Sequence, residues 1–172
     1  MSSNPDRRKK AKRLRSVQGT LDVLGAASGK TTASRSCNGC TACCVAMGVA
    51  ELDKQPFSAC RFAEDGQGCG CYETRPESCR NYQCIWVQGA LPDAFWPKLS
   101  GVVMDMGRPR SGTFREDDLP LTLREVRDGA LDAAPMKAFI EKVKRKRVVI
   151  LFTKDSRRLL GPPEKLRALE TD

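Results

Sequence analysis

The clearest alternation of apolar and polar positions lies in the C-terminal half of the chain. Residues 102–106, 119–126 and 148–152 are rich in apolar and β-branched side chains, and this pattern predicts three short strands. A turn follows the third strand at Lys154 and Asp155, and residues 159–160 then form a short returning segment. The pattern therefore predicts a small sheet in this half of the molecule.

A helical periodicity lies between the second and third of these strands. Apolar residues recur there at steps of three and four after Pro135, which suits the first turn of a helix. They are Met136, Phe139, Ile140 and Val143. We expect this stripe to be core, and we expect Phe95 and Trp96 to fill the join between the sheet and the preceding part of the chain. The basic residues at the end of this stripe are expected to be the solvated end of the helix, namely Lys142, Lys144, Arg145, Lys146 and Arg147.

A second helical periodicity lies near the N-terminus. Ala11, Leu14, Val17, Leu21 and Leu24 recur at steps of three and four, and Gly25 follows as a stop signal. This pattern predicts a basic amphipathic helix. The next stretch, GAASGKTTASRS at 25–36, is typical of a flexible linker.

Positive charge is concentrated in the same segment. Residues 1–36 hold a net charge of +7 out of the +9 of the whole chain. One interpretation is a weak contact with nucleic acid or an acidic protein, in which seven basic side chains neutralise phosphates or carboxylates. These are Arg7, Arg8, Lys9, Lys10, Lys12, Arg13 and Arg15. We favour the simpler interpretation of a solvated helix or a disordered extension, because the run has no interleaved aromatic residues and basic side chains alone do not read bases.

Cysteine is the most informative residue type in this chain. All nine cysteines lie between residues 37 and 84, four of them in the octapeptide CNGCTACC at 37–44, and the chain has no histidine. Thiols at this density are expected to form disulfides or to bind metal. Buried, inert cysteines are a third interpretation, but it does not explain the C-x-x-C-x-x-C-C spacing.

The start of the chain bears on this choice. It reads MSSNPDRRKKAKRLR, without the apolar segment of a secretory signal, and the longest apolar run, residues 148–152, is far too short to span a membrane. We therefore expect a cytoplasmic protein without membrane insertion. Disulfides rarely persist in a reducing cytosol, and nine thiols cannot all pair within one chain. Metal ligation is accordingly favoured.

Neighbouring cysteines suggest more than one metal ion. On a helix Cys43 and Cys44 diverge by about 100°, whereas Cys37, Cys40 and Cys44 would share one face. Two adjacent metal centres, or one polynuclear cluster, are therefore favoured over a single ion. Gly39 would supply the conformational freedom that a C-x-x-C turn needs.

The metal itself stays open between zinc and iron. The lack of histidine excludes mixed Cys/His zinc fingers and Rieske centres, but both Cys-only zinc sites and iron–sulfur clusters remain. Val45 follows Cys44 where the ferredoxin ligand run has proline. Because four thiolates on one zinc ion leave a net charge of −2, we expect compensating cations nearby. The candidates are Arg61, Arg75 and Arg80.

Two motifs resemble a known family. CNGCTACC at 37–44, together with CRF at 60–62 and GCGCYETRPESCRNYQC at 68–84, is similar to the CxxCxxCC, or YkgJ-like, cysteine cluster proteins. The resemblance implies zinc or iron chelation through eight ligands. They are Cys37, Cys40, Cys43, Cys44, Cys60, Cys69, Cys79 and Cys84. Cys71 stands where the family usually has an aliphatic residue, so it is expected to be packed or to be a spare thiol.

The resemblance also supplies an enzymatic alternative. A branch of the family contains flagellin lysine methylases, which suggests an iron–sulfur-dependent protein methyltransferase. The chain has no glycine-rich nucleotide loop and no histidine, and residues 116–118 are typical of an exposed acidic loop rather than of a poised carboxylate pair. The sequence therefore argues against an enzyme, without deciding the question, and we assign no catalytic residue.

Together these observations predict an α+β protein: a small cysteine-rich metal-binding unit followed by a small mixed layer of strands and helix. The expected divisions are a basic tail and linker at 1–36, a cysteine unit at 37–98 and a sheet layer at 99–172. The leading functional hypothesis is a zinc- or iron-binding cysteine cluster protein. The alternatives are a nucleic-acid- or ribosome-associated module with structural metal, and the methyltransferase.

Overall fold

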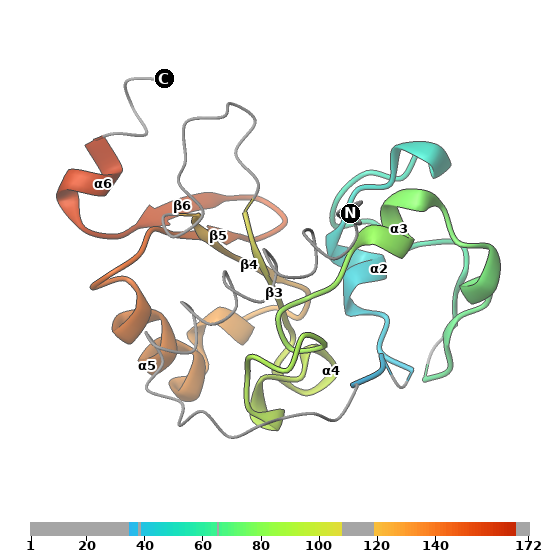
Figure 1. Ribbon diagram of the computed structural model, residues 1–172, viewed down its shortest axis with the longest axis horizontal. Helices are drawn as coiled ribbons and strands as arrows, with labels where there is room; N and C mark the ends of the chain where they lie inside the picture. The colour runs from blue at the N-terminus through green and yellow to red at the C-terminus, as the bar shows by residue number, and fades with distance from the viewer. Residues whose placement is uncertain (1–34, 38, 65, 108–118, 168–172) are drawn as a thin grey trace, which may run out of the picture.

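The computed structural model describes residues 35–37, 39–64, 66–107 and 119–167 (Figure 1). Helices and strands are mixed in it, and the strands form two separate sheets, so the expected α+β class is confirmed. The predicted N-terminal helix, the seven basic residues of the tail and the acidic residues 116–118 lie outside the described residues. Within the described residues, no helix has the length and apolar character needed to cross a membrane.

A four-stranded sheet forms the main layer of the fold. Its spatial order is β3-β4-β5-β6, with antiparallel pairing at both ends and parallel pairing between β4 and β5. The strands are β3 (Val102–Met106), β4 (Leu121–Glu125), β5 (Val149–Phe152) and β6 (Arg157–Leu160). These strands confirm the segments expected from the alternation, including the return after the turn at 154–155.

The crossover from β4 to β5 contains the predicted helix. A 3-10 turn, η5 (Ala130–Asp132), leads into α5 (Ala134–Val143), which has proline in its first turn. The four apolar residues of its stripe are all buried in the main core, which confirms the helical periodicity. Parallel neighbouring strands need such a crossover, and α5 supplies it. A last short helix, α6 (Pro163–Arg167), follows β6.

Burial decreases across the sheet from β3 to β6. Val102, Val103 and Met104 are consecutive and all buried, although neighbouring side chains on a strand point to opposite faces. Strand β3 is therefore covered on both faces. In β5 buried and half-buried residues alternate, and Arg157–Leu160 of β6 is mostly exposed.

The basic run after α5 differs from the prediction in one residue. Arg147 is only 6% exposed, and its guanidinium donates a hydrogen bond to the Leu119 carbonyl 2.6 Å away, just before β4. The expectation that the whole run is solvated was therefore wrong at Arg147. Its long side chain satisfies a carbonyl of the loop that enters the sheet, a partner that sequence spacing does not reveal.

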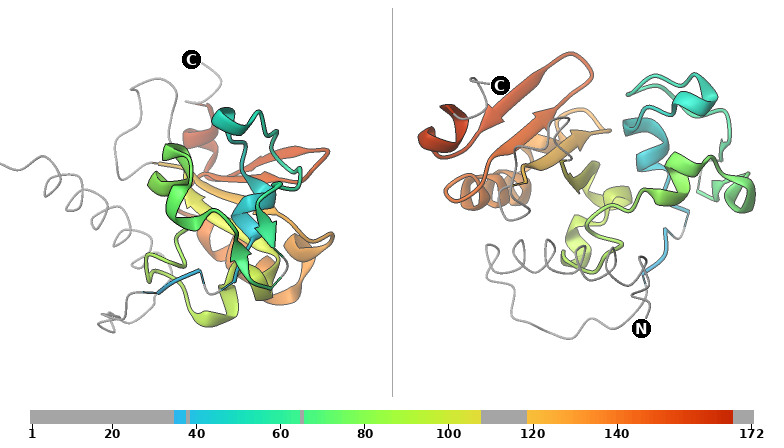
Figure 2. Two further views of the ribbon diagram at one scale, coloured as in Figure 1. Left: turned by 90° about the vertical axis from the view of Figure 1, so that its right-hand side faces the viewer. Right: turned by 45° about the horizontal axis from the view of Figure 1, so that its top comes forward.

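The cysteine unit lies beside the β3 edge of the sheet (Figures 1 and 2). It contains only short elements joined by turns. They are α2 (Ala42–Ala46), η1 (Ala50–Leu52), β1 (Ala63–Glu64), β2 (Gly68–Cys69), η2 (Tyr72–Thr74), α3 (Glu77–Asn81), η3 (Asp93–Phe95) and α4 (Pro97–Ser100). The Ile85 N–H donates to the Met104 carbonyl at 2.9 Å, so the unit partly pairs with the free edge of β3.

Aromatic side chains occupy the join between the two parts. The Trp96 ring stacks on Trp86, with ring centroids 5.5 Å apart. Phe95 contacts Phe139 of α5 at 4.9 Å between ring centroids. The two residues expected at the join therefore contact opposite sides of it: Trp96 contacts the cysteine unit and Phe95 contacts the helix that covers the sheet.

Candidate metal centre

All nine cysteines line a single cavity. Its volume is about 640 Å³, and its walls come from the turns and short helices of the cysteine unit, with Trp86, Trp96 and Val103 completing them. None of the nine thiols is in a disulfide. Eight of them are half-buried and Cys84 is buried. Side chains that are up to 47 positions apart in sequence thus face one space.

The first four cysteines reach the cavity through a turn followed by a helix. The Cys40 N–H donates to the Cys37 carbonyl at 2.8 Å, and α2 begins only at Ala42. The expected helical face shared by Cys37, Cys40 and Cys44 was therefore wrong, because the first two lie in the turn. The turn still directs both thiols into the same cavity as Cys43 and Cys44.

Gly39 explains why a turn forms here. Its φ is +71°, in the left-handed region that glycine adopts without strain. A Cβ at this position would lie 2.3 Å from the Gly66 carbonyl oxygen. The C-x-x-C turn therefore packs backbone against backbone on the loop between β1 and β2, and only glycine fits.

A two-stranded hairpin positions the next three cysteines. Ala63 of β1 pairs with Cys69 of β2, and the Gly70 N–H extends the pairing by donating to the Phe62 carbonyl at 2.8 Å. Cys60 lies just before β1 and Cys71 just after β2, so both lie at the open end of the hairpin. The Sγ atoms of Cys69 and Cys71 are 3.6 Å apart.

The last two cysteines come from α3 and from the segment that enters the core. Cys79 lies in α3, which is held to η1 because the Ser78 hydroxyl and N–H both donate to the Glu51 carboxylate, at 2.8 and 3.0 Å. Cys84 lies one residue before Ile85, which pairs with β3. The core thus fixes Cys84, whereas α3 depends on contacts within the unit.

The thiols act on one another electrostatically within two neighbourhoods. The hairpin neighbourhood contains Cys60, Cys69, Cys71 and Cys79, and the other contains the 37–44 segment and Cys84. Burial and then the thiols of Cys69, Cys60 and Cys79 raise the pKa of Cys71. Burial raises the pKa of Cys84 most, and the thiols of Cys37 and Cys40 raise it further. Backbone hydrogen bonds to Cys84 act in the opposite direction. The two neighbourhoods adjoin, because Cys44 acts on Cys79 and Cys69 acts on Cys37.

Cys43 and Cys44 are adjacent in sequence, but their pKa values are shifted in opposite directions. A hydrogen bond between the two thiols lowers the pKa of Cys44 and raises that of Cys43. Lys54 and Arg75 further favour the Cys44 thiolate. Cys44 is therefore the thiol that ionises most readily of this pair.

Lys54 is a buried cation beside these thiols, and sequence reasoning missed it. It is only 9% exposed, and its ammonium donates to the carbonyls of Val45, Met47 and Gln55 at 3.2, 2.5 and 3.1 Å. Burial lowers the pKa of Lys54, while four thiols act in the opposite direction. They are Cys60, Cys44, Cys43 and Cys79. No spacing or motif in the sequence distinguishes this lysine from exposed ones.

The three arginines expected to compensate thiolate charge are placed differently. Arg75 and Arg80 line the cavity, and Arg75 also stacks 3.5 Å from the centre of the Tyr72 ring. Arg61 does not line the cavity and lies over Phe62 instead. Arg35, from the edge of the predicted linker, lines the cavity and forms an ion pair with Asp93 at 2.9 Å.

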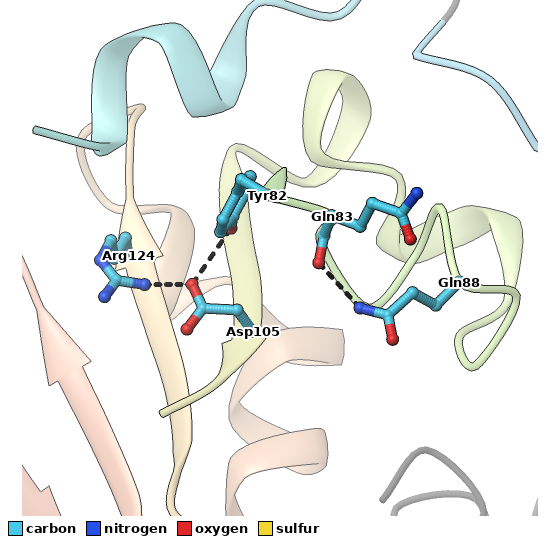
Figure 3. Close-up of polar contacts among 5 residues, drawn as sticks. All are labelled: Tyr82, Gln83, Gln88, Asp105 and Arg124. Atoms are coloured by element: carbon cyan, nitrogen blue, oxygen red, sulfur yellow. Dashed lines mark hydrogen bonds and ion pairs between the residues drawn. The ribbon is translucent and has the colours of Figure 1, made fainter. Parts of the chain in front are cut away.

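A polar contact couples the cavity wall to the sheet (Figure 3). Tyr82 lines the cavity, and its hydroxyl donates to the Asp105 carboxylate at 3.0 Å. The same carboxylate oxygen accepts from Arg124 on the next strand. Burial and the negative charge of Asp105 raise the pKa of Tyr82, so its phenol stays protonated and can donate.

The donor set fits a thiophilic metal. Cysteine ligands without imidazole suit zinc or iron–sulfur clusters, and the cavity offers nine thiols beside Lys54 and Arg75. The indole N–H groups of Trp86 and Trp96 are buried without a hydrogen-bond partner among the described residues, and both residues line the cavity. Such donors suit the sulfur atoms of a thiolate centre.

The thiols do not already stand in a closed ligand arrangement. Over the described ranges, no three Cys, Asp or Glu side chains are grouped so that they could hold one ion. Binding therefore requires the thiols to move inward from the walls of the cavity.

Comparisons with known proteins add no relative. The chain matches no protein-family model, no curated protein and no solved structure.

Proposed function

We propose that this protein binds zinc or iron through cysteine thiolates alone, in the cavity of its cysteine unit. The observation that carries the proposal is the convergence of nine free thiols on one cavity. Free thiols at this density are explained by metal ligation better than by packing, because packing does not require them to face a common space.

The ligands in this proposal include the eight cysteines that the family resemblance implies, and they hold one or two all-thiolate centres. Membership of the CxxCxxCC family is part of the same proposal. A cytoplasmic location also belongs to it, since thiolate ligands must stay reduced.

Under this proposal the residues around the cysteines have separate roles. Lys54 and Arg75 offset the negative charge that thiolates add to the cavity, and Gly39 allows the two ligand-bearing loops to approach. Trp86 and Trp96 exclude water from one wall. A bound zinc ion would act structurally, whereas an iron–sulfur cluster would add electron transfer.

Metal analysis of the full-length protein, purified without oxygen, tests the proposal. We expect at least one zinc or iron ion per chain, bound through sulfur as measured by X-ray absorption. Visible absorption with acid-labile sulfide identifies an iron–sulfur cluster, and a colourless protein with stoichiometric zinc identifies a zinc centre. A protein that contains no metal and binds neither ion after reduction contradicts the proposal.

A further inference from the structure

Cys69 and Cys71 are spaced as two ligands of one ion would be. In a tetrahedral zinc site with Zn–S bonds of about 2.3 Å, two sulfur atoms lie about 3.8 Å apart. The two Sγ atoms here are 3.6 Å apart. In the protonated pair one thiol donates its hydrogen to the other sulfur, and metal binding would displace that proton.

The hairpin gives this pair a third partner. The β1–β2 pairing, extended by the hydrogen bond from Gly70 to Phe62, brings Cys60 and Cys71 to the same end of the hairpin. All three cysteines of the hairpin line the cavity. The thiols that act electrostatically on Cys71 are Cys69, Cys60 and Cys79.

The remaining cysteines form a second neighbourhood, which adjoins the first because Cys69 acts on Cys37 and Cys44 acts on Cys79. The thiols that act on Cys84 and Cys40 come from the CNGCTACC segment at 37–44 and not from the hairpin. This segment with Cys84 offers enough thiolates for one centre without Cys71. Within the hairpin neighbourhood, however, only three thiols remain if Cys71 is omitted.

We propose that Cys71 is a metal ligand that completes a second all-thiolate centre together with Cys60, Cys69 and Cys79. The first centre then draws on the 37–44 segment and Cys84. This inference rests on the proposed function. It replaces the expectation from sequence that Cys71 is a spare thiol, because the Cys71 sulfur lies 3.6 Å from the Cys69 sulfur and lines the same cavity as Cys60 and Cys79.

The test compares single substitutions in the full-length protein. Reduced, metal-free protein is reconstituted with Zn²⁺ or Co²⁺, and bound ions are counted by native mass spectrometry. We expect Cys71→Ser and Cys79→Ser each to bind one ion fewer than the unsubstituted protein, because each removes one of the four ligands of the second centre. Glu73→Gln, in the exposed turn after Cys71, is the control and is expected to keep full stoichiometry.

A second variant, Cys71→His, distinguishes the loss of a metal ligand from a general failure to fold. Cys71→His supplies an imidazole that zinc and cobalt accept in place of a thiolate. We expect it to restore the lost ion and to weaken the sulfur-to-cobalt charge-transfer absorption relative to the unsubstituted protein. Full stoichiometry in Cys71→Ser with an unchanged cobalt spectrum in Cys71→His overturns the assignment of Cys71 while leaving the proposed function intact. Failure of the unsubstituted protein to bind either ion overturns both.

Discussion

The sheet layer and the cysteine unit differ in what stabilises them. In the sheet, β3 and β4 are buried on both faces and α5 adds a continuous apolar stripe. Between residues 50 and 83, by contrast, Lys54 and Gly68 are the only buried residues among those described. The first region has a core, and the second has a cavity lined with thiols. A segment of this kind gains little from apolar burial, and under our proposal its order comes from the metal that the thiols bind.

The strongest test of this difference is metal removal. Under our proposal a structural zinc contributes on the order of 10 kcal/mol to the folding of the segment that holds it. Hydrogen exchange with and without a strong chelator should show loss of protection across residues 37–84, while β3, β4 and β5 keep theirs. Equal loss in both regions, or unchanged protection across residues 37–84, would contradict the distinction.

A second test shortens a buried side chain in the sheet and leaves the cysteine unit unchanged. Leu123 is fully buried in β4, and Leu123→Ala should cost about 2–5 kcal/mol because it leaves a cavity. Leu159→Ala in β6 is the control, since Leu159 is 37% exposed and should cost about 1 kcal/mol or less. Urea unfolding followed by circular dichroism measures both. We expect added Zn²⁺ not to rescue Leu123→Ala, and full rescue would show that metal holds the sheet as well.

Lys54 is a buried positive charge of the cysteine unit, and its removal tests whether that charge supports metal binding. Lys54→Met keeps the length of the side chain but removes its charge and three hydrogen bonds to carbonyls. Loss of a group that supports metal ligands typically weakens binding about 10- to 100-fold, and we expect that range for Zn²⁺ in a competition titration. Lys137→Met removes only an exposed ion pair with Asp132 and should leave affinity unchanged. Equal affinities for the two variants would remove Lys54 from the metal centre.

The smallest expected effect concerns the contact between the regions. Tyr82→Phe removes the hydrogen bond to Asp105 and leaves the pair of Asp105 with Arg124 in place. We expect a loss of about 1 kcal/mol in unfolding free energy of the metal-loaded protein. Tyr72→Phe is the control, because Tyr72 is 46% exposed. A loss much larger than this would mean that the two regions fold as one unit.

How far the sequence could predict this molecule also divides along the two regions. Apolar runs and helical spacing predicted β3, β4, β5 and α5, because the side chains of each of these elements pack into one core. They did not predict that β4 and β5 pair in parallel, since strand order depends on contacts between distant residues. In the cysteine unit, spacing singled out the thiols but placed Cys37 and Cys40 on a helix. The positive φ of Gly39 makes a turn there instead.

The contacts of individual side chains were the least predictable part. Lys54 and Arg147 look like surface cations in sequence, yet both are buried because nearby carbonyls accept their hydrogen bonds. Likewise the aliphatic position of the family pattern gave no sign that Cys71 would lie 3.6 Å from the Cys69 sulfur. Such contacts arise from loop geometry, which periodicity does not encode.

The contact of the cysteine unit with the β3 edge sets an order of events during synthesis. The ribosome releases the cysteines first, yet Ile85 pairs with a strand that belongs to a sheet completed only at residue 160. At about 5–20 residues per second, the thiols emerge several seconds before the surface on which they pack exists. During that interval nothing downstream shields them from oxidants or competing ions. Under our proposal, the nascent chain could therefore bind its metal ion before the sheet is complete.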